Sequence, residues 1–269
     1  LSIFRQIPQI EVAIGNDKNG LVTALLLRIM APLTAADEQT LKEFADKYHV
    51  QWWLQSKGPD TITLFYPDGN RLQYWLPEFD VEMPFKPGDF TQVNHQINQV
   101  LVSRAIRLLG IGAGHRVADL FCGLGNFSLP MARLAREIVG IEGSETLTQR
   151  AREAAIRNGL QDNTRFETRN LFDMTEDEWV ALGAFDRVLI DPPRDGAASV
   201  CQSIAALDDE HKRFRPERIV YVSCNPSTLA RDAGILAGSG HYRLVSAGVV
   251  NMFPHTSHVE SMAVFERKD

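Results

Sequence analysis

The chain has 269 residues, of which 44% are hydrophobic and 23% charged, and its formal net charge is −6 at pH 7. This composition is typical of globular proteins, and the absence of any apolar run of about eighteen residues excludes a membrane-spanning helix. The acidic balance gives no general sign of nucleic-acid binding. Such binding would rest on a local basic patch or on sequence outside this chain.

Three cysteines occur, Cys122, Cys201 and Cys224. An odd and sparse set of this kind argues against a disulfide framework and indicates a reducing, cytoplasmic environment. A structural zinc site needs paired short spacings such as C-x2-C, which the chain lacks, so we expect no metal.

Residues 1–86 are predicted to form a small α+β domain. Residues 7–17 and 20–30 read as strands, and residues 34–50 read as a helix with acidic residues in its first turn. Thr34 is the expected N-cap of that helix.

Two further strand segments follow, at 51–56 and 61–76. The Pro-Asp-Gly-Asn sequence at 67–70 lies inside the second segment and predicts a hairpin there. Three prolines in and beside residues 78–90 indicate a linker. Aromatic residues that alternate along strands usually face a core, so we favour core positions over an RNA-stacking platform for Trp52, Trp53 and Trp75.

From residue 87 to residue 269, strand and helix segments alternate, which predicts a second, larger domain. The helix-like stretch at 144–159 ends in Asn-Gly, a natural helix stop. Such alternation is typical of an α/β fold with a doubly wound parallel sheet, which binds ligands at the carboxyl ends of its strands. Seven strands are expected, at 116–121, 137–142, 164–170, 187–192, 218–224, 243–250 and 260–267.

The first of these strands leads into a glycine loop, DLFCGLGNFSLPMA. Gly123 and Gly125 permit a tight turn that brings the backbone close to a bound ligand. A dinucleotide fingerprint would have a third glycine where Ser128 stands. Glu142 ends the next strand, where a carboxylate can accept ribose hydroxyls. This pattern favours S-adenosylmethionine over a dinucleotide. Asn170, after the third strand, is either a contact to an adenine edge or an ordinary loop residue.

Two unusual loops follow the fourth and fifth strands. In IDPPRDG, two prolines hold the backbone after Asp191 rigid. Amino-methyltransferases carry an aromatic residue in place of Arg194, so exocyclic-amine chemistry is less favoured here. Cys224 ends the fifth strand, directly before a helix that Asn225 caps, and the positive end of a helix favours a thiolate. A lone cysteine is more often a small buried hydrophobe, but neighbouring strand ends face one crevice, which favours a functional Cys224.

A thiolate at this position fits the methylation of carbon 5 of a pyrimidine. That carbon is a poor nucleophile until a thiolate adds to carbon 6 and makes carbon 5 electron-rich. After methyl transfer, a base must remove the carbon 5 proton before the cysteine leaves. His255, His258 and Glu260 all lie in the C-terminal segment, and the residues alone leave the base open among them.

Five motifs in order resemble the bacterial RNA uracil-5-methyltransferase family: DFTQVN, DLFCGLGNFSLP, DPPRDG, SCNPSTLARD and MFPHTSHVES. The similarity runs from about Phe85 to the C-terminus and is greatest to the 23S ribosomal RNA branch of the family. It implies a Rossmann-like class I methyltransferase fold, S-adenosylmethionine as the methyl donor, and ribosomal RNA as the substrate.

The resemblance also implies roles for individual residues. Cys224 matches the family's nucleophile, and Glu260 matches the base that removes the carbon 5 proton. Gln92 and the choice of Glu260 over the histidines rest on the resemblance alone. Contacts to S-adenosylmethionine are matched by Gln92, Phe121, Asn126, Glu142, Asn170 and Asp191, beside the loop glycine Gly123.

Family members of this type also carry an N-terminal RNA-binding barrel and an iron–sulfur cluster held by four cysteines. No cysteine precedes Cys122, and the sequence starts at Leu1, so either the chain is truncated or this member lacks those parts. We expect no cluster here, weakened RNA affinity and an intact chemical site. We also expect a cytoplasmic monomer with no membrane and no obligate protein partner.

Alternative functions stay open beside this one. They are the same reaction on transfer RNA, an amino-methyltransferase, and a non-catalytic RNA-binding module that has kept the fold. A target base would have to flip out of its stack to reach the crevice. Arg194, Arg231 and the basic run at 212–218 are candidates for phosphate contacts, although that run fits a solvated face equally well.

Overall fold

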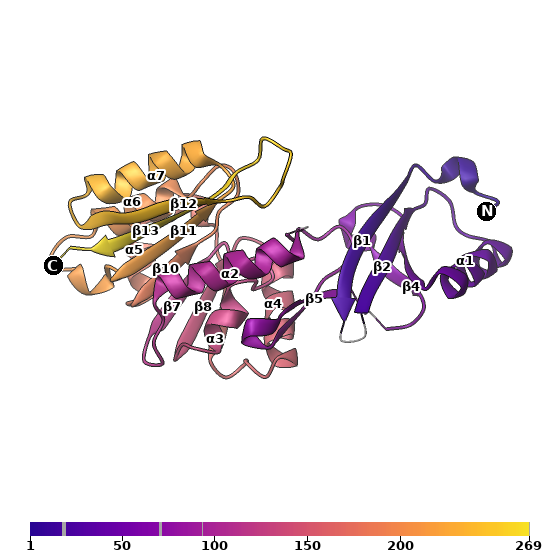
Figure 1. The fold of residues 1–269 in the computed structure, drawn as a ribbon, viewed down its shortest axis with the longest axis horizontal. Helices are drawn as coiled ribbons and strands as arrows, with labels where there is room; N and C mark the ends of the chain where they lie inside the picture. Colours follow the sequence, from indigo (N-terminus) through magenta and orange to yellow (C-terminus); the bar gives the residue numbers. More distant parts are fainter. Residues whose placement is uncertain (18–19, 70–71, 93, 269) are drawn as a thin grey trace. The chain divides into compact units, whose positions relative to one another are not determined.

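The computed structural model describes residues 1–17, 20–69, 72–92 and 94–268. The chain folds into two compact units (Figure 1). The first contains Leu1–Trp75 and Glu82–Val93, and the second contains Leu76–Val81 and Asn94–Asp269. The boundary expected after residue 86 therefore lies inside the first unit.

The first unit is built on a four-stranded sheet of order β1-β2-β3-β4. Thr34 caps the helix as predicted, since its hydroxyl accepts the Asp37 N–H while the Asp37 carboxylate accepts the Thr34 N–H. The strand pairs β1–β2 and β3–β4 are antiparallel. The pair β2–β3 is parallel, and the helix forms the connection between these two strands. The elements are β1 (Gln9–Asp17), β2 (Gly20–Arg28), α1 (Ala35–Tyr48), β3 (Val50–Gln55) and β4 (Thr63–Tyr66).

The core prediction for two of the tryptophans is confirmed. Trp52 and Trp53 are 5% and 2% exposed, so neither offers a stacking face to RNA. Trp52 packs with Leu41 and Ala45 of α1 in one hydrophobic cluster. Trp75 is half-buried.

The predicted hairpin at 67–70 is wrong within the described residues, and Asn70 itself lies outside them. β4 pairs with β3, whereas β5 (Gln73–Leu76) pairs with β6 (Val81–Pro84) in a separate two-stranded sheet. β6 also interrupts the segment that was expected to be a linker. The short 3-10 turn at Pro77–Phe79 connects β5 to β6, so that the two strands can pair. A short connection between paired strands costs less conformational entropy to close than a long one.

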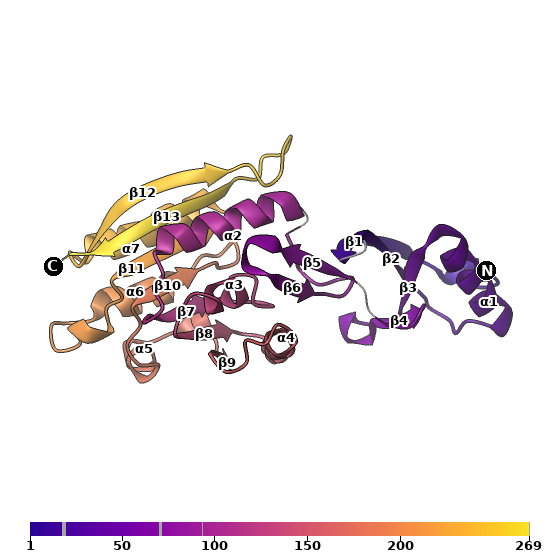
Figure 2. The same cartoon turned by 60° about the horizontal axis from the view of Figure 1, so that its bottom comes forward.

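The second unit contains a seven-stranded sheet of order β12-β13-β11-β10-β7-β8-β9. All seven predicted strands are present. Figure 2 shows the β12–β13 pair at one edge of this sheet and β9 at the other. The strands are β7 (Arg116–Leu120), β8 (Glu137–Glu142), β9 (Thr164–Thr168), β10 (Arg187–Ile190), β11 (Arg218–Ser223), β12 (Tyr242–Val250) and β13 (Glu260–Arg267).

One strand departs from the parallel arrangement that the alternation predicts. β13 runs antiparallel to both β11 and β12, while the neighbouring pairs from β11 to β9 are parallel. Residues 251–259 form the connection from β12 to β13, and this is too short for the crossover that a parallel pair needs. The last strand must therefore turn back beside β12.

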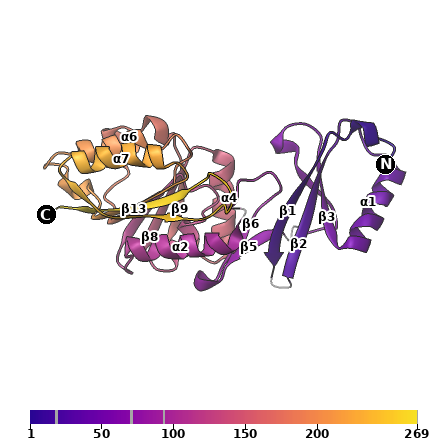
Figure 3. The same ribbon diagram turned by 45° about the horizontal axis from the view of Figure 1, so that its top comes forward.

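Helices cover both faces of this sheet. Figure 3 shows α6 and α7 on one face and α2 on the other. The helices are α2 (His95–Leu109), α3 (Ser128–Ala132), α4 (Glu145–Arg157), α5 (Glu176–Ala181), α6 (Ala198–Ala206) and α7 (Pro226–Gly238). Further 3-10 turns lie at Phe4–Gln6, Pro59–Thr61, Leu171–Asp173 and Lys212–Phe214. No helix in the described ranges is both long and apolar enough to cross a membrane.

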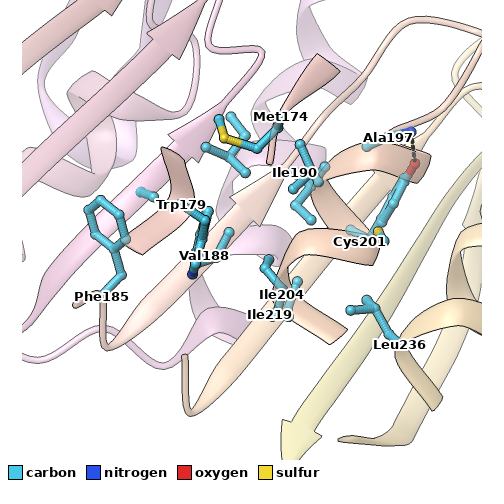
Figure 4. Close-up of a cluster of buried hydrophobic side chains, with 14 of the residues drawn as sticks. Met174, Trp179, Phe185, Val188, Ile190, Ala197, Cys201, Ile204, Ile219 and Leu236 are labelled. Atoms are coloured by element: carbon cyan, nitrogen blue, oxygen red, sulfur yellow. Dashed lines mark hydrogen bonds between the residues drawn. The ribbon is translucent and has the colours of Figure 1, made fainter. Parts of the chain in front are cut away.

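One core cluster of the second unit lies between the sheet and α5, α6 and α7 (Figure 4). Ile190 and Ile219 from the strands meet Trp179 of α5, Ile204 of α6 and Leu236 of α7, each 0% exposed. This fully buried layer fixes where the central strands end. The loops that carry DPPR and SCNP therefore start from rigid positions.

Residues 76–81 belong to the second unit because side chains of that unit hold them. Arg107 of α2 forms an ion pair of 2.9 Å with Glu78. Arg133 donates to the carbonyls of Phe79 and Asp80, at 3.1 and 2.9 Å.

Candidate active site

Cys224 and Glu260 are cross-strand neighbours at the end of β11. The antiparallel register ends with Ser223 opposite Ser261, so Cys224, the residue directly after β11, continues this register opposite Glu260, the first residue of β13. Residues directly opposite each other in an antiparallel pair have Cβ atoms about 5 Å apart. The two predicted catalytic residues, 36 positions apart in the chain (260 minus 224), therefore meet at one sheet edge.

The helix after Cys224 has the predicted N-terminus. Asn225 is the N-cap of α7, its side-chain oxygen accepting the Ser227 N–H at 3.1 Å, and Pro226 occupies the first turn. Cys224 is half-buried, whereas Cys122 and Cys201 are buried. Of the three thiols, Cys224 is the accessible one.

The surroundings of Cys224 raise the pKa of its thiol, contrary to the expectation that the helix terminus would favour the thiolate. Partial burial is the largest cause, and the nearby Glu260 carboxylate adds to it, while the Arg194 guanidinium acts in the opposite direction. Asp191 also raises this pKa. The resting thiol is therefore protonated, and its ionisation depends on how Arg194 and the carboxylates are placed.

Three carboxyl groups line the carboxyl ends of the central strands. Burial raises the pKa of Asp191 to about 8 and that of Asp119 to about 7, and it also raises the pKa of Glu260, which is 4% exposed. The Glu260 charge contributes to the raised pKa of Asp191. These groups are close enough to interact, and Asp119 and Asp191 are poised to take up protons near neutral pH.

Arg194 links the DPPR loop to the C-terminal loop. Its guanidinium lies 2.8 Å from Nδ1 of His258, and its carbonyl accepts from Asn225 Nδ2 at 3.0 Å. His258 also stacks edge-on against Phe253. His255 is exposed and has a positive φ of 65°. The register that brings Glu260 opposite the thiol gives neither histidine that position.

The glycine loop turns through three residues with positive φ. These are Phe121, Gly123 and Gly125, at 63°, 53° and 92°. A Cβ on Gly123 would meet no atom within 4 Å, so the backbone borders open space there. The Phe121 ring packs at 5.6 Å from Phe172.

Asn126 braces this loop against α2. Its amide and that of Asn98 exchange two hydrogen bonds of 3.0 and 3.1 Å, and Asn98 is 1% exposed. Ser128, in place of a third glycine, donates to Oδ2 of Asp119 at 2.5 Å.

Glu142 closes the loop from the next strand. Its carboxylate accepts the N–H groups of Gly123 and Ser144, at 3.2 and 3.1 Å. Asn170 is exposed and forms a local turn, accepting from the Phe172 N–H and donating to Asp173. A carboxylate has about four acceptor positions, so Glu142 keeps capacity for a ligand, while the side chain of Asn170 already makes two local bonds.

Gln92 belongs to the first unit, two residues before the second unit resumes. Its side-chain oxygen is buried, and no described residue forms a hydrogen bond with it. Val93, next to it in the FTQVN motif, lies outside the described residues. The contact of Gln92 with the methyl donor stays a prediction.

The residues at this edge fit a nucleoside-bearing ligand such as S-adenosylmethionine. Asp119 Oδ1 is buried and has no partner among the described residues, the space beside Gly123 is free of described atoms, and Glu142 retains acceptor capacity. Buried polar atoms are rarely left unpaired, and acidic groups suit a donor that carries a sulfonium charge.

Residues 76–268 match the sequence profile of the tRNA (Uracil-5-)-methyltransferase family. The chain belongs to this family. The 23S rRNA (uracil(1939)-C(5))-methyltransferase RlmD of Burkholderia thailandensis is 62% identical over 267 residues, which cover 99% of this chain and 57% of the relative. RlmD of Ralstonia nicotianae is 60% identical over 270 residues, covering 99% and 59% respectively. The chain thus spans somewhat more than half the length of these relatives.

Solved structures share the class I methyltransferase fold. Pyrococcus abyssi tRNA (uracil-54, C5)-methyltransferase, in complex with S-adenosyl-L-homocysteine, superposes with a TM-score of 0.71 at 24% identity, over 94% of this chain and 59% of that chain. TYW2 of M. jannaschii, in complex with AdoMet, gives a TM-score of 0.56 at 15% identity, over 96% and 100%. The predicted fold class is confirmed.

Sequence reasoning missed the residues that support the site. It assigned no role to Asn98, to Ser128 as the partner of Asp119, or to Asp232, a fully buried carboxyl that bonds the backbone after the DPPRDG loop to α7. A polar residue among apolar neighbours is the available signal for such positions. It does not reveal which distant residue the side chain meets.

Proposed function

We propose that this chain carries the catalytic part of a 23S ribosomal RNA uracil-5-methyltransferase that uses S-adenosylmethionine. The observation that carries the proposal is the β11–β13 register, which brings the Cys224 thiol opposite the Glu260 carboxylate. Asp191 and the glycine loop lie at the same strand ends. Family membership and the names of the relatives support the same reaction.

The donor would be held by the glycine loop and the strand ends around it. S-adenosylmethionine, when bound, supplies an electrophilic methyl group. Glu142 would accept its ribose hydroxyls, and the Gly123 backbone would approach it closely. The remaining proposed contacts are Gln92, Phe121, Asn126, Asn170 and Asp191.

Cys224 would act as the nucleophile. Its thiol must first lose a proton, and the Arg194 guanidinium favours the thiolate that forms. The thiolate adds to carbon 6 of the uracil, so carbon 5 becomes electron-rich and accepts the methyl group. Glu260 then removes the proton from carbon 5, and the sulfur leaves as the ring double bond re-forms. A carboxylate with a raised pKa is a stronger base for that step.

Ribosomal RNA is the proposed substrate because the most similar relatives reported above act on 23S rRNA by name. Transfer RNA is the second candidate, since the matching family is described by that substrate. Methylation assays on both RNAs, with labelled donor, distinguish the two. We further propose a monomer that acts in the bacterial cytoplasm and holds no iron–sulfur cluster.

The test is a covalent trap. Ribosomal RNA substituted with 5-fluorouridine has no proton at carbon 5, so the elimination step stalls and the protein stays bonded to the base. Trypsin would release residues 219–231, a peptide in which Cys224 is the only cysteine. Mass spectrometry should find the nucleotide adduct on this peptide.

Cys224→Ser separates the candidate mechanisms. We expect it to lose the adduct and essentially all methylation, whereas an amino-methyltransferase would keep its activity. A variant that methylates normally would refute the proposal. Because the chain spans only part of its relatives, the same substitution is made in full-length B. thailandensis RlmD as a control for RNA binding.

A further inference from the structure

A buried carboxyl group of α7 bonds to the backbone directly after the DPPRDG loop. We propose that Asp232 is a positioning residue: it locks the DPPRDG backbone onto α7 and thereby holds Arg194 in place beside Cys224. This inference rests on the proposed function only in taking Cys224 as the nucleophile.

Asp232 is 0% exposed and receives three donors. Its Oδ2 accepts from the Ala197 N–H at 2.7 Å and from the Tyr221 hydroxyl at 2.6 Å, and its Oδ1 accepts from Arg231 Nε at 2.8 Å. The Ala197 N–H also lies 3.0 Å from the hydroxyl oxygen of Tyr221. A neutral amide has a single acceptor atom and could not serve all three donors in this way.

The loop is anchored to α7 along its length. Arg231 Nη2 donates to the Asp195 carbonyl at 2.8 Å, and Asn225 Nδ2 and Thr228 Oγ1 donate to the Arg194 carbonyl at 3.0 and 3.2 Å. α7 begins two residues after Cys224. The thiol and the DPPRDG loop are therefore held as one rigid assembly.

Gly196 shows how closely the loop approaches α7. Its φ is +79°, and a Cβ there would lie 2.6 Å from both Arg231 Nη2 and Asp232 Oδ2. Arg231 and Asp232 therefore occupy the space that a side chain at position 196 would need.

The chemical consequence falls on the thiol. The charged groups that face Cys224 are Glu260 from β13, Asp191 from the end of β10 and Arg194 from the loop. Arg194 is the cation of this set, and its guanidinium lowers the pKa of the thiol. If the loop moves away from α7, the thiolate loses the Arg194 guanidinium as its partner. The Glu260 and Asp191 carboxylates then raise the pKa of the thiol further.

The experiment measures the pH dependence of iodoacetamide alkylation at Cys224, read by mass spectrometry on peptide 219–231 of the whole protein. Asp232→Asn should move the midpoint to higher pH and slow alkylation at pH 7 by roughly three- to tenfold, because fewer thiols are ionised. Gly196→Ala places a methyl group between the loop and α7 and so pushes the two apart. It should therefore also move the alkylation midpoint to higher pH. Tyr221→Phe removes one donor and should give a smaller shift in the same direction.

Two control variants distinguish positioning from general stability. Asp209→Asn removes an exposed carboxylate that pairs with Arg215 and should leave the midpoint unchanged. Trp179→Phe removes a buried hydrogen bond from α5 to the Phe214 carbonyl. It should lower stability without changing a residue of the DPPRDG loop or of the segment that carries Cys224.

A midpoint that stays at the wild-type value in Asp232→Asn and Gly196→Ala would overturn the proposal. The proposal would also be overturned if Trp179→Phe shifted the alkylation midpoint as much as Asp232→Asn does while losing the same amount of Tm. If Asp232→Asn fails to fold, Gly196→Ala and Tyr221→Phe decide. Alkylation needs neither RNA nor donor, so its outcome is independent of whether Cys224→Ser abolishes methylation.

Discussion

At the scale of single residues, the site is a cluster of acids with one thiol and one guanidinium. Burial raises the pKa of Asp119 to about 7 and that of Asp191 to about 8. Protonated carboxyls can donate hydrogen bonds, and ionised ones favour a cationic ligand. The cluster is therefore matched to a reaction in which a positively charged donor meets a base that takes up a proton.

Glu260→Gln should arrest the proposed reaction after methyl transfer. An amide cannot take the proton from carbon 5, so the cysteine has no route to leave. We expect a covalent protein–RNA complex with ordinary uridine RNA, visible as a band of reduced mobility in a denaturing gel, and turnover lowered by at least about a hundredfold. Cys224→Ser/Glu260→Gln should form no such complex. If Glu260→Gln still turned over normally, another residue would have to remove the carbon 5 proton.

Asp119→Asn should change how stability depends on pH. The folded-state pKa of about 7 lies above the unfolded value of about 3.9, so the folded protein holds a proton that the unfolded chain has released. The free energy of unfolding contributed by this group therefore falls as the pH rises from about 4 to 7, by at most about 1.4 kcal/mol per pH unit.

Urea unfolding at pH 5 and pH 7 measures this effect. The free energy of unfolding of Asp119→Asn, relative to wild type, should be higher at pH 7 than at pH 5. An equal difference at both pH values would mean that Asp119 is ionised in the folded protein at pH 5.

At the scale of elements, packing between neighbouring strands and helices decides which positions tolerate a methyl group. Gly140 of β8 leaves no room, because a Cβ would lie 2.6 Å from the ring of Phe166 and 3.0 Å from the sulfur of Cys122. Gly234 of α7 has nothing within 4 Å. Two glycines in regular structure thus have opposite packing environments.

Gly140→Ala should destabilise the protein by about 1–3 kcal/mol through overpacking. Gly234→Ala should stabilise it by about 0.5–1 kcal/mol, because alanine is the better helix former. Thermal unfolding of both variants measures the contrast. Equal effects would contradict the β8–β9 packing described above.

At the scale of the whole molecule, the chain passes between the two units three times. Leu76–Val81 belong to the second unit, Glu82–Val93 return to the first, and the chain from Asn94 onward belongs to the second. Residues 76–81 depend on α2 and Arg133 for their polar contacts. A division by composition and prolines would assign them to the first unit, because they are close to it in sequence.

Arg133→Ala should loosen residues 76–81. It removes the bonds to the Phe79 and Asp80 carbonyls, each worth about 1 kcal/mol. Native-state hydrogen exchange should show reduced protection of this segment. Arg136→Ala is the control, since Arg136 is exposed three residues away and should leave protection unchanged. Unaltered exchange in Arg133→Ala would remove the basis for assigning the segment to the second unit.

Local rules are enough to predict the elements and the strand-end motifs. Thr34 and Asn225 are helix caps because short polar side chains satisfy free N–H groups locally, and β11 contains the continuous apolar run 219–222. The seven strands and the positions of Cys224, Glu142 and Asp191 at strand ends follow from such local rules.

Contacts across the fold set which of these residues meet. The separation of β4 from β5 and the pairing of Cys224 with Glu260 depend on strand order, which local sequence does not encode. The raised pKa of the thiol arises from burial and from neighbours distant in the chain. Asp232 acquires its three donors in the same way, because hydrogen bonds across a fold depend on distance in space rather than in sequence.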